Sequence, residues 1–267
     1  SSRDAADSRA SLAAVGAKPH SFTNCLNFGN PEKPDRLWYF REAVRGIGLT
    51  AEALGIPIPS GNVSLYNESA LGPSPPTPVV LGVGMVEDLR LCVSSDFKRE
   101  GDAIFLVGRT ANELGGSEYL RLRKKAGGVV PATDPHGLRA SMDHLLQAMK
   151  AKTVAACHDL SHGGLAIAAA EMCLGGDIGA DLDTAAVDPM RWDVQLFSES
   201  NGRWLVEVVK GHEEEFQHLL EGVPVAYVGR VGGTSLRLRC GKKGASLSLP
   251  AMRKAWTEAI PKQVVVS

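Results

Sequence analysis

The chain has 267 residues, of which 44% are apolar and 22% are charged, as is usual for a globular protein. Lys and Arg total 29 and Asp and Glu total 30, so the formal net charge of −1 gives no sign of nucleic-acid or polybasic membrane binding. The five cysteines form no CxxC pair, and no stretch approaches about 18 apolar residues. We therefore expect a soluble, cytoplasmic protein with reduced thiols, and neither nucleic acid nor membrane among its partners.

The first part of the chain is predicted to contain two helices and three extended segments. An alanine-rich run over residues 4–15 has helical spacing and is followed by Gly16, a residue type that often ends helices. The next helix is expected to start at Asp35, a suitable N-cap residue, and to end at Gly55. Extended segments are predicted over residues 19–28, 56–58 and 79–86.

From about residue 93 the alternation of strands and helices starts again. Short loops between alternating strands and helices are typical of an α/β protein with mixed sheets and packed helices. The change near residues 87–93 divides the chain into two predicted domains, 1–92 and 93–267. In the second domain, strands are predicted over residues 103–108, 153–157, 203–209, 225–231 and 235–239, and helices over residues 136–150, 165–172 and 212–220.

Two polar segments of the first domain have residues suited to ligand binding. The segment TNCLNFGNP contains three asparagines, among them Asn24, although Asn and Gly are also common in turns. In the segment SGNVSLYN, Gly61 would let the backbone approach a phosphate, and Asn62 offers a neutral oxygen ligand to Mg²⁺. The Ser64 hydroxyl can form a hydrogen bond to a phosphate or a carbonyl group. Taken alone, the GNxS pattern is a weak signal.

Two further polar segments, HDLSHGG and LFSESNGR, belong to the second domain. Asp159 of the first segment could face a cation while the following helix N-terminus holds an anion. Alternatively, Asp159 or Ser161 is simply the N-cap of that helix. Glu199 and Ser200 of the second segment could contact a ligand at the end of the sheet, with Arg203 as the ion-pair partner of Glu199. The alternative there is a polar turn before a buried strand.

The chain contains none of the familiar motifs of covalent catalysis or of phosphate-binding loops. GxSxG, HExxH, GxxxxGK[ST] and a helix-opening GxGxxG are all absent from the sequence. Residue chemistry alone therefore predicts no more than a cytosolic α/β protein whose glycine- and asparagine-rich loops could bind a Mg²⁺–phosphate ligand.

Six segments in colinear order span nearly the whole chain: TNCLNFGNPEKPD, ALGIPIPSGNVSLYNES, PTPVVLGVGMVEDL, NELGGSEYLR, CHDLSHGGLAIAAAEM and LFSESNGRWLVEV. Together they resemble formylglycinamide ribonucleotide amidotransferase, also called phosphoribosylformylglycinamidine synthase. The chain is most similar to the second of two tandem aminoimidazole ribonucleotide synthetase-like copies in the small form of the synthetase subunit. The resemblance implies that α/β fold, with an N-terminal domain that is incomplete here and a first copy that is absent.

The resemblance implies an ATP-dependent carbon–nitrogen ligase of purine biosynthesis. In this family ATP phosphorylates an amide oxygen of formylglycinamide ribonucleotide, and ammonia released from glutamine then displaces phosphate to give the amidine. The matching positions imply that Asn24 and Gly61 contact ATP, that Asn62 binds Mg²⁺ and that Ser64 contacts the ribonucleotide. Many relatives have Asp where Asn24 stands, so a role that depends on charge is not expected at this position.

The same resemblance implies a second group of site residues and a set of partners. Asp159 and Ser161 match residues that hold an auxiliary nucleotide or metal in the large form of the enzyme. Glu199 and Ser200 resemble a substrate loop of the first copy, while His162 stands where an acidic residue is more usual. The implied partners are the glutaminase subunit, a small accessory subunit and the remainder of the synthetase subunit.

Three functions are compatible with these observations. The leading one is part of the ligase, although this fragment alone is expected to be inactive because the catalytic histidines of the first copy are absent. The alternative is a non-catalytic scaffold half that completes the pseudo-dimer and docks the accessory subunits. A related ATP-using enzyme of the same fold, such as a selenophosphate synthetase-like or hydrogenase-maturation protein, is disfavoured by the spellings NFGNPEKP and GNVSLYNES.

Overall fold

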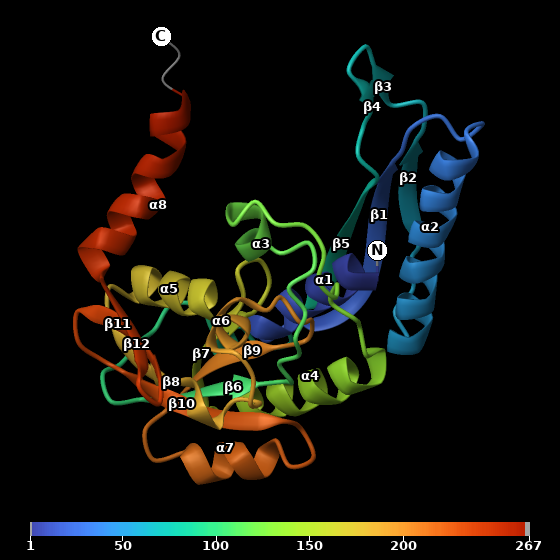
Figure 1. The fold of residues 1–267 in the computed structure, drawn as a ribbon. Coiled ribbons are helices and arrows are strands. Elements are labelled where there is room, and N and C mark those ends of the chain that lie inside the picture. The colour runs from blue at the N-terminus through green and yellow to red at the C-terminus, as the bar shows by residue number, and fades with distance from the viewer. Residues whose placement is uncertain (1, 265–267) are drawn as a thin grey trace.

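The computed structural model describes residues 2–264, which form two main β-sheets, a short hairpin and the helices packed on the sheets (Figure 1). The smaller sheet has the strand order β2-β1-β5. Its central strand β1 pairs in parallel with β2 and antiparallel with β5, while β3 and β4 form the hairpin. The bounds are β1 (Lys18–Asn27), β2 (Ser60–Ser64), β3 (Glu68–Ser69), β4 (Gly72–Pro73) and β5 (Thr77–Met85).

Two helices, α1 (Ser2–Ala14) and α2 (Pro34–Leu54), cover one face of the smaller sheet. α1 lies directly on β5, where a Cβ added to Gly82 would be 2.6 Å from the Ser8 hydroxyl, so glycine permits this approach. The opposite face is not covered by any described helix, and every second residue of β5 exposes about half of an apolar side chain there. These residues are Val79, Leu81, Val83 and Met85.

The larger sheet has seven strands in the order β12-β11-β8-β10-β6-β9-β7. All neighbouring strands are antiparallel except β8 and β11, which run parallel. The bounds are β6 (Ala103–Val107), β7 (Val154–Asp159), β8 (Ala180–Asp183), β9 (Trp204–Val208), β10 (Val225–Val231), β11 (Ser235–Cys240) and β12 (Lys243–Ser248).

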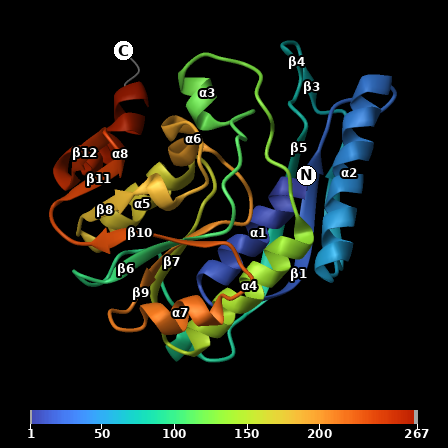
Figure 2. The ribbon, with the colours of Figure 1, turned by 60° about the horizontal axis from the view of Figure 1, so that its bottom comes forward.

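Helices cover both faces of the larger sheet (Figure 2). α1, α4 and α7 bury apolar side chains against one face, and α5 and α8 do so against the other. Within residues 2–264, no helix combines the length and apolar character needed to span a membrane. The bounds are α3 (Glu118–Leu122), α4 (Pro135–Lys150), α5 (Gly164–Gly176), α6 (Trp192–Phe197), α7 (Glu213–Leu219) and α8 (Leu249–Val264), with short 3-10 helices at Leu89–Leu91 and Thr184–Ala186.

An alanine stripe on α1 connects the two sheets into one hydrophobic core. Ala6, Ala10 and Ala13 are buried in the same cluster as Phe105 of β6 and Trp204 of β9. The Trp204 indole Nε1 donates a hydrogen bond to the Ala10 carbonyl oxygen at 3.0 Å. Small side chains let the helix approach both sheets closely, so α1 is shared by the two parts of the chain.

The α/β architecture with mixed sheets and packed helices is as predicted, but two local predictions are wrong. The N-cap of α2 is Lys33, not Asp35, and Pro34 opens the helix. Asp35 lies in the first turn, where its negative charge interacts favourably with the positive end of the helix dipole. The strand predicted at 56–58 begins later, at β2. By contrast, Gly55 does end α2, with a left-handed φ of 66°.

Candidate functional site

The four residues expected to bind ATP, Mg²⁺ and substrate lie on the neighbouring parallel strands β1 and β2. In the strand register Asn24 pairs with Gly61, Cys25 with Asn62, and Asn27 with Ser64. β2 is an edge strand, so its outer backbone edge is not paired with another strand of the sheet. Two segments that are more than thirty residues apart in sequence thus form one continuous surface.

Strand geometry distributes these four residues over both faces of the sheet, because successive side chains of a strand point to opposite sides. Asn24 and Gly61 belong to the face that also carries the buried Phe22. A Cβ added to Gly61 would be 2.5 Å from the Asn24 side-chain oxygen, so the Asn24 amide occupies the space that glycine leaves. Asn62 and Ser64 belong to the opposite, uncovered face.

Hydrogen bonds fix the polar side chains of the uncovered face. The Asn62 Nδ2 donates to the Cys25 sulfur at 3.5 Å, and the Ser64 hydroxyl donates to the Asn67 Oδ1 at 3.1 Å. The Asn67 Nδ2 donates in turn to the carbonyl oxygens of Phe28 and Ser64. Asn67 therefore holds the end of β2 against the end of β1, a role that the sequence pattern alone does not reveal.

The described residues do not make a magnesium site by themselves. Among residues 2–264, no three His, Cys, Asp or Glu side chains come together in a group that could hold a metal ion. Mg²⁺ prefers octahedral oxygen ligands and is usually held by one or two carboxylates together with substrate phosphates. Asn62 offers one neutral oxygen beside the Cys25 thiol.

Asp159 and Ser161 line a second hollow, formed with α1 and β5, with a volume of about 560 Å³. The Ser11 hydroxyl of α1 donates to the Asp159 Oδ2 at 3.0 Å, and Asp7 lines the same hollow one helical turn earlier. Sequence reasoning missed Asp7 and Ser11. Their four-residue spacing on the side of α1 away from the alanine stripe is the signal that could have revealed them.

His158 lies next to this hollow and is half-buried. Its Nε2 is 3.1 Å from the Glu171 carboxylate of α5, and its Nδ1 is 2.7 Å from the Asp159 carbonyl oxygen. Burial lowers the pKa of His158, but the hydrogen bond to Glu171 and the charge of Asp159 outweigh burial, so its pKa is raised overall. The imidazole therefore favours its protonated form and links β7 to α5.

Glu199 and Ser200 are buried, and their side chains accept hydrogen bonds from backbone N–H groups of other segments. The Glu199 Oε1 accepts hydrogen bonds from the backbone N–H groups of Gly163 at 2.9 Å and Glu118 at 3.0 Å. Gly163 is the N-cap of α5, so neither Asp159 nor Ser161 has that place. The Ser200 hydroxyl accepts a hydrogen bond from the Ala111 N–H at 3.1 Å.

The buried Arg203 guanidinium binds carbonyl and hydroxyl oxygens of the same loops. It donates to the carbonyl oxygens of Ser198 and Ser200 and to the Thr110 hydroxyl. Burial lowers its pKa to about 10, against the attraction of Glu113 and Glu199. The segment 198–203 thus ties together the loops beside the larger sheet, and none of these bonds reaches β1 or β2.

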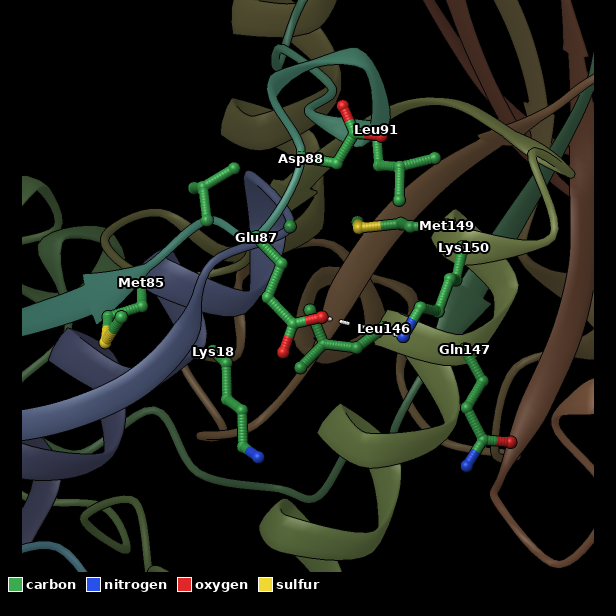
Figure 3. A pocket seen from close by; sticks show the side chains of 11 residues that line it. Lys18, Met85, Glu87, Asp88, Leu91, Leu146, Gln147, Met149 and Lys150 are labelled. Atoms are coloured by element: carbon green, nitrogen blue, oxygen red, sulfur yellow. Dashed lines mark ion pairs between the residues drawn. The ribbon is translucent and has the colours of Figure 1, made fainter.

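A smaller cavity of about 200 Å³ lies where β1 and β5 meet the C-terminal end of α4. Figure 3 shows Glu87 and Lys150 pointing toward one another at its mouth, with a carboxylate–ammonium distance of 3.6 Å. Leu91, Leu146 and Met149 form its apolar part. None of the predicted site residues lines this cavity.

Comparison with protein families identifies both parts of the chain. Residues 99–241 match the C-terminal domain of AIR synthase related proteins, and residues 5–86 match the N-terminal domain of these proteins. The two matches leave a gap at residues 87–98, which contains the connection between the two sheets. The predicted aminoimidazole ribonucleotide synthetase-like fold agrees with this result.

The curated relatives carry one name. Phosphoribosylformylglycinamidine synthase subunit PurL of Moorella thermoacetica is 42% identical over 260 residues, which are 96% of this chain and 35% of that protein. The subunit of the same name from Anaeromyxobacter dehalogenans (strain 2CP-C) is 41% identical over 263 residues, 94% of this chain and 34% of that protein. The chain spans about a third of the length of these relatives.

Solved structures show the same fold. Thermotoga maritima PurL complexed with FGAR superimposes with a TM-score of 0.73 at 19% identity, covering 94% of this chain and 43% of that chain. T. maritima PurL complexed with ATP gives a TM-score of 0.68 at 19% identity, covering 91% of this chain and 39% of that chain. At this level of identity the comparison establishes the fold.

Proposed function

The chain belongs to the family of AIR synthase related proteins, and on this premise we propose that it is the second synthetase-like copy of a PurL-type subunit. The proposed activity is the ATP-dependent conversion of formylglycinamide ribonucleotide to formylglycinamidine ribonucleotide in purine biosynthesis. Two kinds of observation support this: the curated relatives are PurL subunits, and the solved structures of T. maritima PurL are complexes with ATP and with FGAR.

The strand register of β1 and β2 is the single observation on which the site assignment depends. It brings Asn24 and Gly61 side by side on one face, and Asn62 and Ser64 lie on the opposite face at the same edge of the sheet. We assign Asn24 and Gly61 to ATP because an amide and a side-chain-free backbone can approach a nucleotide closely. The Ser64 hydroxyl, on the uncovered face, is assigned to the ribonucleotide.

In the proposed reaction the amide oxygen of the substrate accepts the terminal phosphoryl group of ATP, which leaves ADP. Ammonia then adds to the activated carbon, phosphate departs with the oxygen, and the amidine remains after loss of a proton. The residues of this chain would bind and orient the two substrates. Asn62 would offer its side-chain oxygen to a Mg²⁺ ion, which would neutralise charge on the transferring phosphoryl group.

The uncovered face of the smaller sheet supports a partner for this chain. Val79, Leu81 and Val83 expose about half of their side chains next to one another along β5. Exposed, contiguous apolar surface of this kind marks an interaction site. We assign it to the remainder of the synthetase subunit, with which the glutaminase and small accessory subunits would assemble. A purely structural scaffold role is not favoured, since the relatives are named as synthase subunits.

Three finer assignments belong to the same proposal. The hollow lined by Asp7, Asp159 and Ser161 would hold an auxiliary nucleotide. The division of the chain into units 1–92 and 93–267 follows the separation of the two sheets, with α1 shared between them. A cytoplasmic location is supported by the cysteines, all five of which are free thiols.

Steady-state kinetics of the full-length enzyme test the assignment. Ser64→Ala should raise the KM for formylglycinamide ribonucleotide about fivefold and change the KM for ATP less, since one hydrogen bond to substrate is worth about 1 kcal/mol. Asn62→Ala should lower kcat by about 30- to 1000-fold, as expected for loss of one electrostatic stabiliser. Ser246→Ala, on the exposed edge strand β12, is the matched control and should be neutral. Equal effects of Ser64→Ala on both KM values would contradict the assignment.

A further inference from the structure

We propose that a cationic cavity between α3 and α6 is a separate binding site for a phosphorylated small molecule. The cavity has a volume of about 630 Å³ and lies between α3, the following loop and the start of α6. Figures 1 and 2 both show α3 and α6 side by side above the larger sheet. None of the residues assigned to ATP or to the ribonucleotide lines it.

Tyr119, which lines the cavity, stacks on the neighbouring Phe197 of α6. The rings of Tyr119 on α3 and Phe197 on α6 stack with centroids 4.8 Å apart and planes 7° from parallel. The Tyr119 hydroxyl also donates to the Asp193 Oδ2 at 3.1 Å. Stacking and hydrogen bonding together fix the two helices relative to each other, so Tyr119 is in place before any ligand arrives.

Positive charge dominates the lining. Arg123, Lys125 and Arg191 contribute three cations, against the single carboxylate of Asp193. Asp193 is already engaged by Arg191, whose Nη2 lies 2.6 Å from it. Within the described residues, neither Arg123 nor Lys125 has a carboxylate partner among the salt bridges of the structure. This concentration of charge contrasts with a whole-chain net charge of −1.

Arg123 and Lys125 follow α3 within the segment between Gly115 and Val129, whereas Arg191 is the N-cap of α6. The Gly115 N–H donates to the Val129 carbonyl oxygen at 2.7 Å, which holds the two ends of that segment together. A Cβ on Gly115 would be 2.7 Å from the Gly128 carbonyl oxygen, so a larger residue would break this contact. The Arg123 guanidinium lies over the Tyr119 ring, 5.4 Å from its centroid. This contact orients the charge toward the cavity wall.

The volume and the positive charge of this cavity suit a phosphorylated small molecule. A volume of about 630 Å³ accommodates a nucleotide or a sugar phosphate, in the range usual for small-molecule sites. Arginine forms paired hydrogen bonds with phosphate oxygens, and lysine adds a point charge. A cationic ligand is excluded by the same charges. The site is distinct from the ATP site of the proposed function and does not depend on it.

Calorimetric titration of the full-length protein with inorganic pyrophosphate tests the proposal. The double variant Arg123→Gln/Lys125→Gln should weaken the binding assigned to this cavity at least tenfold, since both side chains are exposed and paired with no acid. The matched control Arg41→Gln/Arg45→Gln removes two exposed cations from α2 and should change the affinity less than twofold. Melting temperatures of all variants confirm that the fold is retained.

Each alternative result overturns the proposal. Absence of pyrophosphate binding at millimolar concentration would show that the cavity is not an anion site. An equal loss in the two double variants would show general electrostatic attraction instead of a site. Unchanged affinity in Arg123→Gln/Lys125→Gln would place the binding elsewhere, for example at Asn24 and Gly61. To separate these places, the titration is repeated in a Gly61→Val background, where binding to the α3–α6 cavity should persist.

Discussion

Replacing Glu207 by glutamine should remove most of the dependence of stability on pH between about pH 4.5 and pH 7. Glu207 is fully buried on β9. Its two carboxyl oxygens accept the backbone N–H groups of Lys98 at 2.8 Å and Arg99 at 2.9 Å. The neighbouring Asp102 is 3% exposed; its Oδ1 accepts the Lys210 N–H at 3.0 Å, and its Oδ2 lies 3.5 Å from the Arg99 Nε. Two carboxyl groups therefore share a buried site.

The magnitude follows from the pKa of Glu207. Burial raises this pKa from 4.5 to about 7; the backbone hydrogen bonds oppose the rise and the nearby Asp102 adds to it. Between these two values the folded chain holds a proton that the unfolded chain has lost. The contribution of Glu207 to the free energy of unfolding is therefore greatest below about pH 4.5 and falls as the pH rises toward 7. At about 1.4 kcal/mol per unit, the loss is about 3 kcal/mol.

Urea unfolding of wild type and Glu207→Gln at a series of pH values from 4.5 to 8 measures the effect. The free energy of unfolding of the wild type should fall by about 3 kcal/mol more than that of the variant over this range. Glu215→Gln, which removes an exposed carboxyl from α7, is the matched control and should retain the wild-type dependence. The raised pKa of His158 also makes the free energy of unfolding fall as the pH rises. Because wild type and variant both contain His158, its contribution cancels in their difference. Parallel curves for wild type and Glu207→Gln would refute the reasoning.

Three further predictions concern the site and its support. Gly61→Ala should weaken ATP binding about tenfold in an equilibrium titration, because the new Cβ would displace the Asn24 amide. The melting temperature should be nearly unchanged, because Gly61 lies on the exposed edge strand β2. Glu199→Ala should lower the free energy of unfolding by about 2–4 kcal/mol in urea, because the buried N–H groups of Gly163 and Glu118 lose their acceptor. The isolated 267-residue chain should form no amidine from formylglycinamide ribonucleotide, ATP and ammonia; measurable turnover would show that the rest of the subunit is dispensable.

The sequence predicts well those elements that are set by local signals. Gly55 ends α2 where a left-handed residue is needed, and the buried run of β6 lies over residues 103–107 as its continuous apolar letters indicate. Asp35 illustrates the limit of local signals. It is a good N-cap by type, but the preceding Pro34 is better suited to the first helical position, and the helix therefore starts earlier.

In the candidate site, too, some features follow from the local sequence and others only from tertiary contacts. The polar segments containing Asn24 and Asn62 can be recognised from the sequence, but their parallel pairing is a tertiary contact, as is the resulting split over two faces. Glu199 looks like a ligand-binding residue because it is acidic and flanked by serines. Its function in the structure depends on the N-terminus of α5, which lies 36 residues earlier in the chain. No local pattern contains that information.

The central claim is that this chain contributes Asn24, Gly61, Asn62 and Ser64 to the site of a PurL-type synthetase. Its most direct test is an assay of the full-length protein for formation of formylglycinamidine ribonucleotide and ADP from formylglycinamide ribonucleotide, ATP and ammonia. We expect one ADP for each amidine formed, with amidine formation strongly reduced in the Asn62→Ala variant. Absence of amidine in the wild-type protein, or undiminished turnover in Asn62→Ala, would contradict the account.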